Sequence, residues 1–267
     1  MSTNAVFSGA VPGNYDRFLG PALFEPYAAD LIARIPRQEG LRVLEVAAGT
    51  GIVTRRLREA LPASATIVAT DLNEPMLDHA RAQVDLPGIV WQQADAQALE
   101  FEDGSFDVYL CQFGLMFLPD KVQGLREARR VLAPGGRLLV NVWESGATNS
   151  HVPPMQAALD RKFPEAPPRF LDVPHGYHDP DRIRADLEAA GWEDVTVESV
   201  RLSSSSPTAL ALATGFAAGS PLTHELAARN ADPLAIAAEL AIELAAVGGD
   251  EPYALELGAL VITAYRS

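Results

Sequence analysis

The sequence predicts an α/β protein built on a doubly wound, mostly parallel sheet with a helical lid or insert. Over the first 150 residues, short apolar runs alternate with amphipathic helical stretches, which is the pattern of a parallel sheet covered by helices. A glycine-containing turn, Gly49-Thr50-Gly51, follows the first of these runs. Hydrophobic residues make up 48% of the 267-residue chain, which is enough for a sizeable core.

Five apolar runs in this half have the length of buried strands. The expected strands are residues 42–47, 66–71, 89–95, 106–113 and 137–143. The helices expected between them are 52–61, 74–84 and 120–132, and the last one is stopped by Pro134-Gly135-Gly136. Ahead of the first strand, residues 24–35 predict a helix, and residues 14–20 are a candidate segment to fold over a site.

The pattern changes after residue 143. Prolines are frequent in residues 144–180, and because proline removes a backbone donor and restricts φ, we expect no long regular element there. A loop of this length inside a compact domain is usually functional, often as a lid. Beyond it the sequence predicts a helix, a strand, two or three helices and a closing strand, at residues 181–190, 195–202, 207–247 and 255–265.

Charge and cysteine content limit the partners and the compartment. The net charge of −14 and the lack of a Lys/Arg run argue against a nucleic-acid surface, which needs cations to displace phosphate counterions. An acidic surface also disfavours anionic membranes. No apolar run reaches about 18 residues, and Met1 to Ala10 lack the features of a signal peptide. With Cys111 as its single cysteine, the chain is expected to be a cytoplasmic protein.

Three consecutive strand ends carry residues suited to a nucleotide-like ligand. Gly49 and Gly51 follow the first strand, and glycines let a ligand approach the backbone closely. Asp71 ends the second strand at the spacing from the glycines at which dinucleotide folds place the acid that binds ribose. Asp95 ends the third strand. Because open parallel sheets bind ligands at the carboxyl ends of their strands, we expect one shared site, with capping roles for both aspartates still open.

Four motifs occur in the order typical of one enzyme family. They are VLEVAAGTG at 43–51, TDLNEPMLDHAR at 70–81, ADAQALEFEDGSFDVYLCQFGLMFLPD at 94–120 and REARRVLAPGGRLLVNVW at 126–143. Together they resemble the class I S-adenosylmethionine-dependent methyltransferases, in particular the small-molecule branch that includes enzymes of ubiquinone and menaquinone biosynthesis. The resemblance implies a seven-stranded Rossmann-like sheet, S-adenosyl-L-methionine as cofactor, and in-line methyl transfer to a small organic molecule.

The resemblance also implies which residues hold the methionine end of the cofactor. Glu45 and the backbone of Ala47, Gly49 and Gly51 would bind this part, and Gln112 would lie beneath the sulfonium. The chain departs from the family at position 47, where alanine replaces the usual glycine. A methyl group is small, so we expect it to shift the turn rather than block the cofactor.

The adenosine end is implied in the same way. Asp71 would bind the ribose, and Leu72 and Met76 would flank the adenine. Asp95 and Ala96 would meet the adenine edge. From the residue type alone, Met76 is more often a core residue than a ligand contact.

Residues of the acceptor side are predicted more coarsely. Phe113, Met116 and Trp143 are candidates to line an apolar acceptor pocket. The region after the fourth strand, Gln112-Phe113-Gly114-Leu115, lacks the Asn/Asp-Pro-Pro-Tyr type of motif with which many nucleic-acid amine methyltransferases hold a base. This supports a small-molecule acceptor, whose identity and methylated atom the sequence leaves open.

Few catalytic side chains are expected. A sulfonium methyl group is already activated, so the enzyme must position a nucleophile, and a base is needed only if that nucleophile starts protonated. The candidates for such a base are Tyr15, His151, His175 and His178. Surface or structural roles stay open for each histidine, and no metal is expected.

The expected organisation follows from these elements. Residues 1–40 form an N-terminal helical cap, residues 41–143 the S-adenosylmethionine-binding core, and residues 144–180 a substrate lid. Residues 181–267 complete the core sheet, with a helical insertion at about 207–247. The oligomeric state is open, with a homodimer as one option.

Two other functions fit parts of the pattern. An NAD(P)-dependent oxidoreductase needs G-x-G-x-x-G, and no third glycine follows Gly51 at that spacing. A non-catalytic protein that kept the fold and the cofactor is the second alternative, because fold does not guarantee activity. Glu45, Asp71 and Asp95 indicate that cofactor binding is retained, but they do not by themselves establish that the protein transfers methyl groups.

Overall fold

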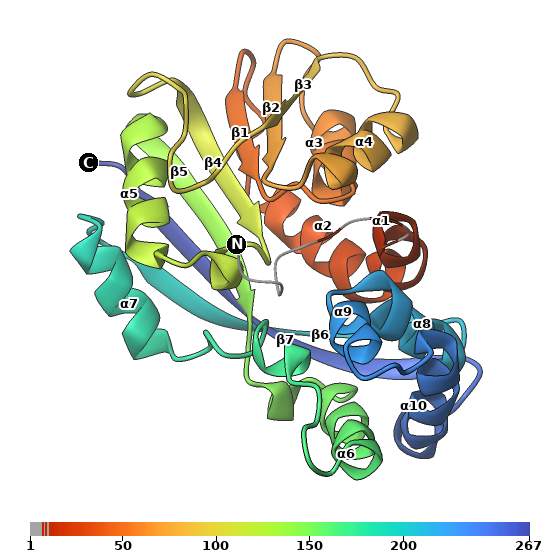
Figure 1. Ribbon diagram of the computed structural model, residues 1–267. Helices are drawn as coiled ribbons and strands as arrows, with labels where there is room; N and C mark the ends of the chain where they lie inside the picture. Colours follow the sequence, from red (N-terminus) through yellow and green to blue (C-terminus); the bar gives the residue numbers. More distant parts are fainter. Residues whose placement is uncertain (1–6, 8, 10) are drawn as a thin grey trace.

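The computed structural model describes Phe7, Gly9 and residues 11–267, and a seven-stranded sheet forms its centre (Figure 1). The strands lie in the order β3-β2-β1-β4-β5-β7-β6. Their bounds are β1 Arg42–Val46, β2 Thr66–Asp71, β3 Ile89–Gln93, β4 Phe106–Gln112, β5 Leu132–Trp143, β6 Thr196–Ser206 and β7 Tyr253–Tyr265. The strands from β3 to β5 are parallel, and β7 runs antiparallel between β5 and β6. The predicted mostly parallel, Rossmann-like sheet is confirmed.

Helices cover both faces of this sheet. Those on one side are α3 Ile52–Ala60 and α4 Glu74–Gln83, and those on the other are α5 Lys121–Val131 and α7 Pro180–Ala189 (Figure 1). The chain winds outward from β1 to β3 and then returns to the centre as β4, so the winding direction reverses between β1 and β4. In open α/β sheets, ligands bind outside the carboxyl ends of the strands at such a reversal.

The predicted helices and strands of residues 42–143 are confirmed, with one difference. The strand expected from residue 137 begins at Leu132, because the Pro134-Gly135-Gly136 turn remains bonded to the end of the chain. The Gly135 N–H donates to the Arg266 carbonyl at 2.7 Å, and the Arg266 N–H donates to the Gly136 carbonyl at 2.9 Å. The turn therefore ends α5 as predicted and also extends the sheet.

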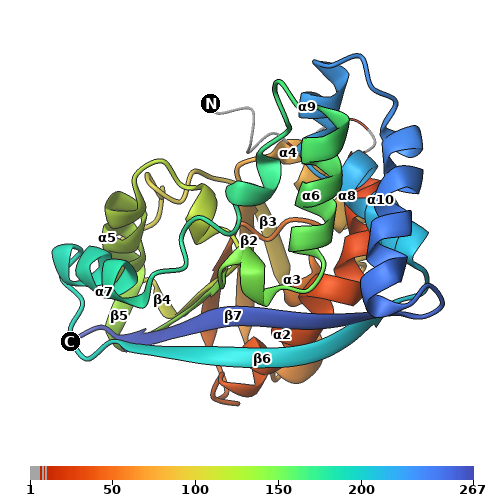
Figure 2. The same cartoon turned by 90° about the horizontal axis from the view of Figure 1, so that it is seen from below.

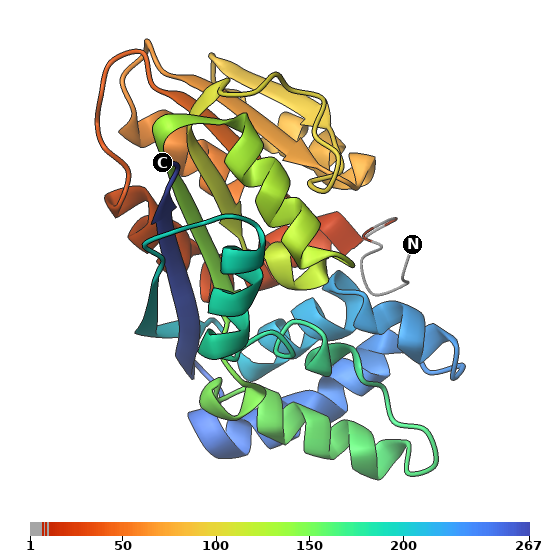
Figure 3. The same cartoon turned by 90° about the vertical axis from the view of Figure 1, so that its left-hand side faces the viewer.

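A second group of helices packs together beside the sheet (Figures 2 and 3). Its members are α1 Val11–Asn14, the π-helix η2 Tyr15–Phe24, α6 Val152–Lys162, α8 Ala209–Gly219, α9 Leu222–Ala227 and α10 Pro233–Gly248. Helix α8 packs against α10 and η2, and α6 packs against α10. Strands β6 and β7 form a long antiparallel ribbon, and α8 to α10 join the two strands at one end of it (Figure 2). The helices predicted for residues 207–247 are confirmed as three.

The remaining helices are shorter or connect the two groups. They are α2 Glu25–Ala33 and the 3-10 helices η3 Leu115–Phe117, η4 Gly146–Thr148 and η5 Phe170–Asp172. Helix α2 lies within the predicted range 24–35 and contacts both α3 and η2. None of the described helices is long and apolar enough to cross a bilayer.

One prediction about the proline-rich region is wrong. Residues 144–180 contain a regular helix, α6, of 11 residues. Its prolines, Pro153 and Pro154, lie in the first turn, where backbone N–H groups have no intrahelical partner and proline is tolerated. The proline content therefore marks the start of a helix here rather than excluding one.

Candidate functional site

The turn between β1 and α3 has an unusual backbone. Ala47, Gly49 and Gly51 all have positive φ, at 53°, 58° and 83°. A Cβ atom on Gly51 would lie 3.0 Å from Trp91 and 3.1 Å from Val84, so a side chain here would crowd its neighbours and force them to shift. The Gly51 N–H donates to the Ala48 carbonyl at 3.0 Å. Gly51 thus lies on the side of the turn that packs against the protein, while Ala47 and Gly49 lie on the side that lines two cavities.

The methyl group of Ala47 has space because a second glycine stands opposite it. A Cβ atom on Gly114 would collide with the Ala47 Cβ and lie 2.8 Å from the Cys111 sulfur. Alanine at position 47 is therefore compatible with this turn as long as residue 114 is glycine.

Glu45 lies at the carboxyl end of β1, deep beneath this turn. Its side chain is 2% exposed and accepts a hydrogen bond from the Thr54 hydroxyl at 2.6 Å. Burial raises the pKa of Glu45 to about 8, and the carboxylate of Asp71 adds to the effect. The free protein therefore holds this carboxyl group largely protonated at neutral pH.

Asp71 lies at the end of β2 and hydrogen-bonds to the turn after β1 and to the turn after β2. Its Oδ2 accepts from the Gly49 N–H at 2.9 Å, and its Oδ1 accepts from the Asn73 N–H at 2.8 Å. Burial raises the pKa of Asp71, although these backbone bonds oppose the rise. A carboxylate has about four lone-pair positions, so room remains for a further donor.

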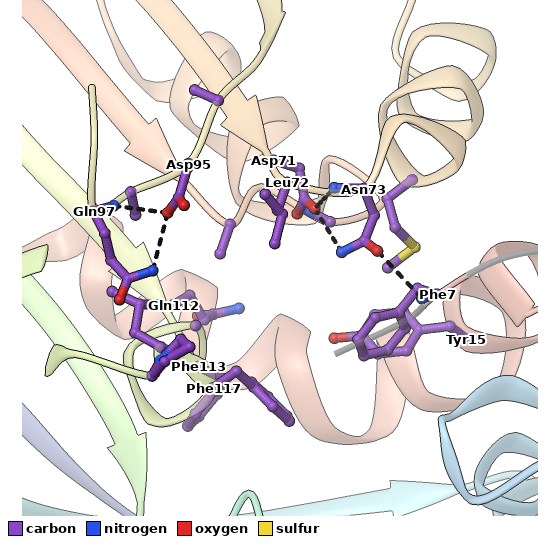
Figure 4. A pocket seen from close by; sticks show the side chains of 18 residues that line it. Phe7, Tyr15, Asp71, Leu72, Asn73, Asp95, Gln97, Gln112, Phe113 and Phe117 are labelled. Atoms are coloured by element: carbon purple, nitrogen blue, oxygen red, sulfur yellow. Dashed lines mark hydrogen bonds between the residues drawn. The ribbon is translucent and has the colours of Figure 1, made fainter. Parts of the chain in front are cut away.

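A cavity of about 780 Å³, including its open mouth, lies against these strand ends, and we call it the edge cavity. Figure 4 shows Asp71, Leu72 and Asn73 beside it, with Asp95, Gln97, Gln112 and the rings of Phe7, Tyr15, Phe113 and Phe117 around it. Its lining also includes Ala47, Gly49, Met76, Ala94, Ala96, Gly114, Leu118 and Pro119. Asp95 is exposed and accepts from the Gln97 N–H at 2.9 Å, so it caps a turn and faces the cavity as well.

A smaller cavity of about 300 Å³, the turn cavity, adjoins it beneath the β1–α3 turn. Tyr15, Glu45, Thr50 and Gln112 supply its polar side chains. The Thr50 hydroxyl and the Gln112 Oε1 are buried without a hydrogen-bond partner among the described residues. Buried polar atoms are almost always paired in folded proteins, so two orphans at one cavity point to a polar ligand.

Phe113 follows β4 in a strained conformation. Its φ is 52°, which is rare for a bulky residue and is found mainly where a functional site requires it. The fully buried Asn141 holds it there, because the Phe113 N–H donates to the Asn141 Oδ1 at 3.0 Å and to its carbonyl at 3.1 Å. This conformation places the Phe113 ring between the edge cavity and a third cavity.

The third cavity, of about 510 Å³, is the aromatic cavity. Its lining is Phe7, Tyr15, Leu19, Leu23, Phe24, Phe113, Phe117, Trp143, His151, Phe170, Pro174, His175, Phe216 and Ser220. The Phe113 ring stacks on Trp143 with centroids 3.7 Å apart, and Tyr15 stacks on Phe24 at 4.8 Å. Phe7, Tyr15, Phe113 and Phe117 line both this cavity and the edge cavity, so the two are neighbours.

The predicted base candidates fall into different surroundings. Tyr15 lines all three cavities, and burial together with the Asp71 carboxylate raises its pKa, so its phenol stays protonated at neutral pH. His151 and His175 are buried in the wall of the aromatic cavity. His178 is exposed and lines none of the three, within the described chain.

The structure therefore brings together most, but not all, of the predicted site residues. Every predicted cofactor residue except Gly51 lines the edge cavity or the turn cavity. On the acceptor side, Phe113 and Trp143 line the aromatic cavity, whereas Met116 is buried and lines none of the three cavities. The segment 14–20, which is expected to fold over a site, includes the start of η2. Its Tyr15 lines the edge cavity.

Sequence reasoning missed several of these residues. Asn141 had a usable signal, because a polar side chain in the apolar run LLVNVW needs a buried hydrogen-bond partner. Phe24, Phe170 and Phe216 had none, since each occurs in a stretch that reads as ordinary helix or loop.

Comparisons with known proteins agree with this geometry. Residues 44–140 match a family model described as a methyltransferase domain. The ubiquinone/menaquinone biosynthesis C-methyltransferase of Serratia proteamaculans is 32% identical over 173 residues, which cover 60% of this chain and 69% of that protein. The chain belongs to the class I S-adenosylmethionine-dependent methyltransferases. A Hahella chejuensis relative of the same name is 45% identical over 105 residues, covering 38% of this chain and 42% of the relative.

Solved structures share the fold of this methyltransferase. The YcgJ protein of Bacillus subtilis superposes with a TM-score of 0.58 at 17% identity, covering 90% of this chain and 97% of that one. Phosphoethanolamine N-methyltransferase 2 of Haemonchus contortus, solved with S-adenosyl-L-methionine, gives 0.61 at 16% identity, covering 96% and 56%. The protein is thus an S-adenosylmethionine-dependent methyltransferase acting on small molecules, and both alternatives considered from the sequence are disfavoured.

Proposed function

We propose that the edge cavity and the turn cavity hold S-adenosylmethionine and that the aromatic cavity holds the methyl acceptor. The observation that carries this proposal is the shared wall. Phe113, Tyr15, Phe7 and Phe117 contact both the edge cavity and the aromatic cavity. A methyl group at the sulfonium then needs to move only a short distance to reach a bound acceptor.

The polar groups at the turn cavity fit the amino-acid end of the cofactor. An α-ammonium group is a donor, and both Glu45 and the unpaired Gln112 Oε1 are acceptors. An α-carboxylate is an acceptor, and the unpaired Thr50 hydroxyl is a donor. We assign this end to Glu45, Thr50, Gln112 and the backbone of Ala47 and Gly49.

The edge cavity fits the adenosyl end. Asp71 keeps an acceptor position for a ribose hydroxyl, and Leu72 and Met76 supply apolar surface for the faces of the adenine. Asp95 and Ala96 line the same cavity, and we assign them to the adenine edge. Residues 41–143 therefore form the cofactor-binding unit, while the acceptor is enclosed by the N-terminal helices, residues 144–180 and the helices of 207–247.

The protein's own part in the reaction is positioning and exclusion of water. The cofactor supplies a methyl group already activated by the sulfonium, so the acceptor must be held in line with it and out of water. The aromatic walls desolvate this space, and the strained Phe113 fixes the boundary at which transfer occurs. The neutral Tyr15 side chain forms part of the wall between the edge cavity and the aromatic cavity, and it does not act as the base that removes a proton.

We also place the activity in the cytoplasm, on free small molecules rather than nucleic acids. The net charge of −14 opposes binding to polyanions. Cys111, the single cysteine, is buried, so the chain has no second thiol with which to form an internal disulfide, and this suits a reducing compartment.

Titration with S-adenosylhomocysteine tests the cofactor assignment. Asp71→Ala should weaken binding by about 1–3 kcal/mol, which is roughly 5- to 150-fold, through lost charge-assisted bonds. The matched control is Asp78→Ala, which removes an exposed aspartate on α4 that pairs with Arg81 and should leave the affinity unchanged. Unchanged affinity in Asp71→Ala would show that Asp71 does not bind the ribose. It would also contradict the proposed position of the cofactor in the edge cavity.

A further inference from the structure

The aromatic cavity contains almost no polar groups, and those present are neutral. No Asp, Glu, Lys or Arg is found among the described residues that line it. Its polar side chains are the Tyr15 phenol, the Trp143 indole, His151, His175 and Ser220. Ser220 is already satisfied, because its hydroxyl donates to the Phe216 carbonyl at 2.6 Å and accepts from the Leu222 N–H at 3.2 Å. Hydrogen bonding to a ligand is therefore left to the two histidines, the Tyr15 hydroxyl and the Trp143 N–H, and of the ring nitrogens only those of the histidines can accept.

The hydrogen bond of His175 determines which of its nitrogens carries the proton. The Nδ1 atom lies 2.9 Å from the backbone carbonyl of Glu144, and a carbonyl oxygen only accepts. Nδ1 must therefore donate, and the neutral ring presents Nε2 as an acceptor. Nε2 has no hydrogen-bond partner among the described residues, while the ring itself lines the cavity.

His151 stands next to it in the same wall. The two ring centroids are 6.4 Å apart, and His151 also contacts the ring of Phe216 at 5.3 Å. Its side chain is 2% exposed, and its Nδ1 is buried without a partner among the described residues. Burial, with the neighbouring His175, lowers the pKa of His151 to about 3, and burial lowers the pKa of His175 as well. Both rings are thus uncharged at neutral pH.

We propose that His175 and His151 each form a hydrogen bond with the methyl acceptor. Together they select an uncharged, ring-containing acceptor that bears a hydroxyl group. This inference rests on the proposed function, in which the aromatic cavity holds the acceptor. A carboxylate, phosphate or ammonium group would be desolvated there without a counter-charge, which is costly. A hydrocarbon without a hydroxyl would leave the imidazole nitrogens unpaired, and sites built to bond a hydroxyl discriminate strongly against analogues that lack it.

Three probes with one ring system separate these chemistries. They are 1-naphthol, naphthalene and 1-naphthoate, titrated calorimetrically into protein saturated with S-adenosylhomocysteine so that the cofactor cavities are filled. We expect 1-naphthol to bind at least tenfold more tightly than either of the others. Naphthoate binding as tightly as naphthol, or no binding by any probe, overturns the proposal.

Two variants assign the preference to residues. His175→Phe keeps a ring in the wall and should lower the preference for naphthol over naphthalene at least threefold, and His151→Phe should do the same. The control is His178→Phe, which changes an exposed histidine outside the cavity and should keep the full preference. A preference that survives in both cavity variants overturns the role of the pair. Saturation with S-adenosylhomocysteine is measured first, so a failure of cofactor binding, which would sink the proposed function, is seen separately.

Discussion

The two halves of this site are built in different ways. The cofactor half is made by the carboxyl ends of neighbouring strands, so the backbone itself places Glu45, Asp71 and the turn between β1 and α3. The acceptor half is made by side chains from η2, β5, η5 and α8, which meet only because the helices pack together. Under the proposed function, the sheet determines where the cofactor binds, whereas helix packing determines which acceptor meets it.

The largest expected effect tests the claim that backbone geometry determines the cofactor half. Gly51→Ala should lower the free energy of unfolding by about 2–5 kcal/mol, adding a left-handed backbone cost of about 1–2 kcal/mol to overpacking of about 1–3 kcal/mol. Overpacking arises because the new Cβ would lie 3.0–3.2 Å from Trp91, Val84 and Ala80. Urea denaturation measures the change.

Gly135→Ala is the matched control for this prediction. Gly135 has a similar φ of 76°, but no atom lies within 4 Å of the position of its added Cβ. The free energy of unfolding of Gly135→Ala should therefore fall only by the backbone cost of about 1–2 kcal/mol. Equal losses in the two variants would mean that packing around the turn is loose and that the contrast between the two halves is overstated.

The second prediction concerns charge, which distinguishes the polar cofactor half from the uncharged acceptor half. Burial raises the pKa of Glu45 to about 8, so the free protein carries its proton at pH 7. An α-ammonium group at this carboxylate favours the ionised form, so ligand binding should release that proton. Affinity for S-adenosylhomocysteine should then rise by up to about tenfold per pH unit from pH 6 toward 8 and level off above it.

Calorimetry in two buffers of different ionisation enthalpy measures the released proton directly. Glu45→Gln retains the shape and a hydrogen-bond acceptor for Thr54, and it should abolish both the proton release and the pH dependence below 8. Proton release that persists in this variant would assign the effect to another group, and its absence in the native protein would remove Glu45 from the ammonium site.

The contrast also explains how much the sequence could predict. Strand ends are spaced by whole βα units, so the positions of Asp71 and Asp95 relative to the glycine turn predict a shared edge, and the structure places both at the edge cavity. Gly51 was assigned to the cofactor from the same motif, yet its N–H is used within the turn. The motif predicts the loop as a whole, whereas the structure shows that Ala47 and Gly49 line the cavities and Gly51 does not.

The acceptor half was predictable only in part, for a physical reason. Phe24, Phe170 and Phe216 are more than 190 residues apart at their extremes, and no local pattern links them. Met116 is a candidate for the pocket from the sequence, but it is buried and lines none of the three cavities. Such placements depend on tertiary packing, which residue spacing does not encode.

A third, smaller effect concerns Tyr15, which belongs to both halves. Tyr15→Ala should remove a ring stacked at 4.8 Å on Phe24 and weaken S-adenosylhomocysteine binding by about 0.5–1.5 kcal/mol. Tyr15→Phe keeps the ring and should bind as the native protein does. A loss in Tyr15→Phe equal to that in Tyr15→Ala would show that the hydroxyl, rather than the ring, carries the role of Tyr15.

The smallest expected effect has the opposite sign and concerns Ala47. Ala47→Gly should relieve a left-handed backbone cost of about 1–2 kcal/mol, partly offset by about 0.4–1 kcal/mol of added freedom in the unfolded chain. The free energy of unfolding should rise by about 0–1.6 kcal/mol, with a central value of about 0.8 kcal/mol. Asn230→Gly is the control, because Asn230 has the same φ of 53° but asparagine tolerates this region, so no gain is expected there.

Cofactor affinity decides what the Ala47 result means for the two halves. If backbone geometry alone builds the cofactor half, glycine at position 47 keeps the turn and S-adenosylhomocysteine binds with unchanged affinity. A loss of more than about tenfold would mean that the methyl group, packed toward Gly114, holds the turn in its binding shape. In that case side-chain packing would govern the cofactor half as it does the aromatic cavity, and the distinction between them would fail at this residue.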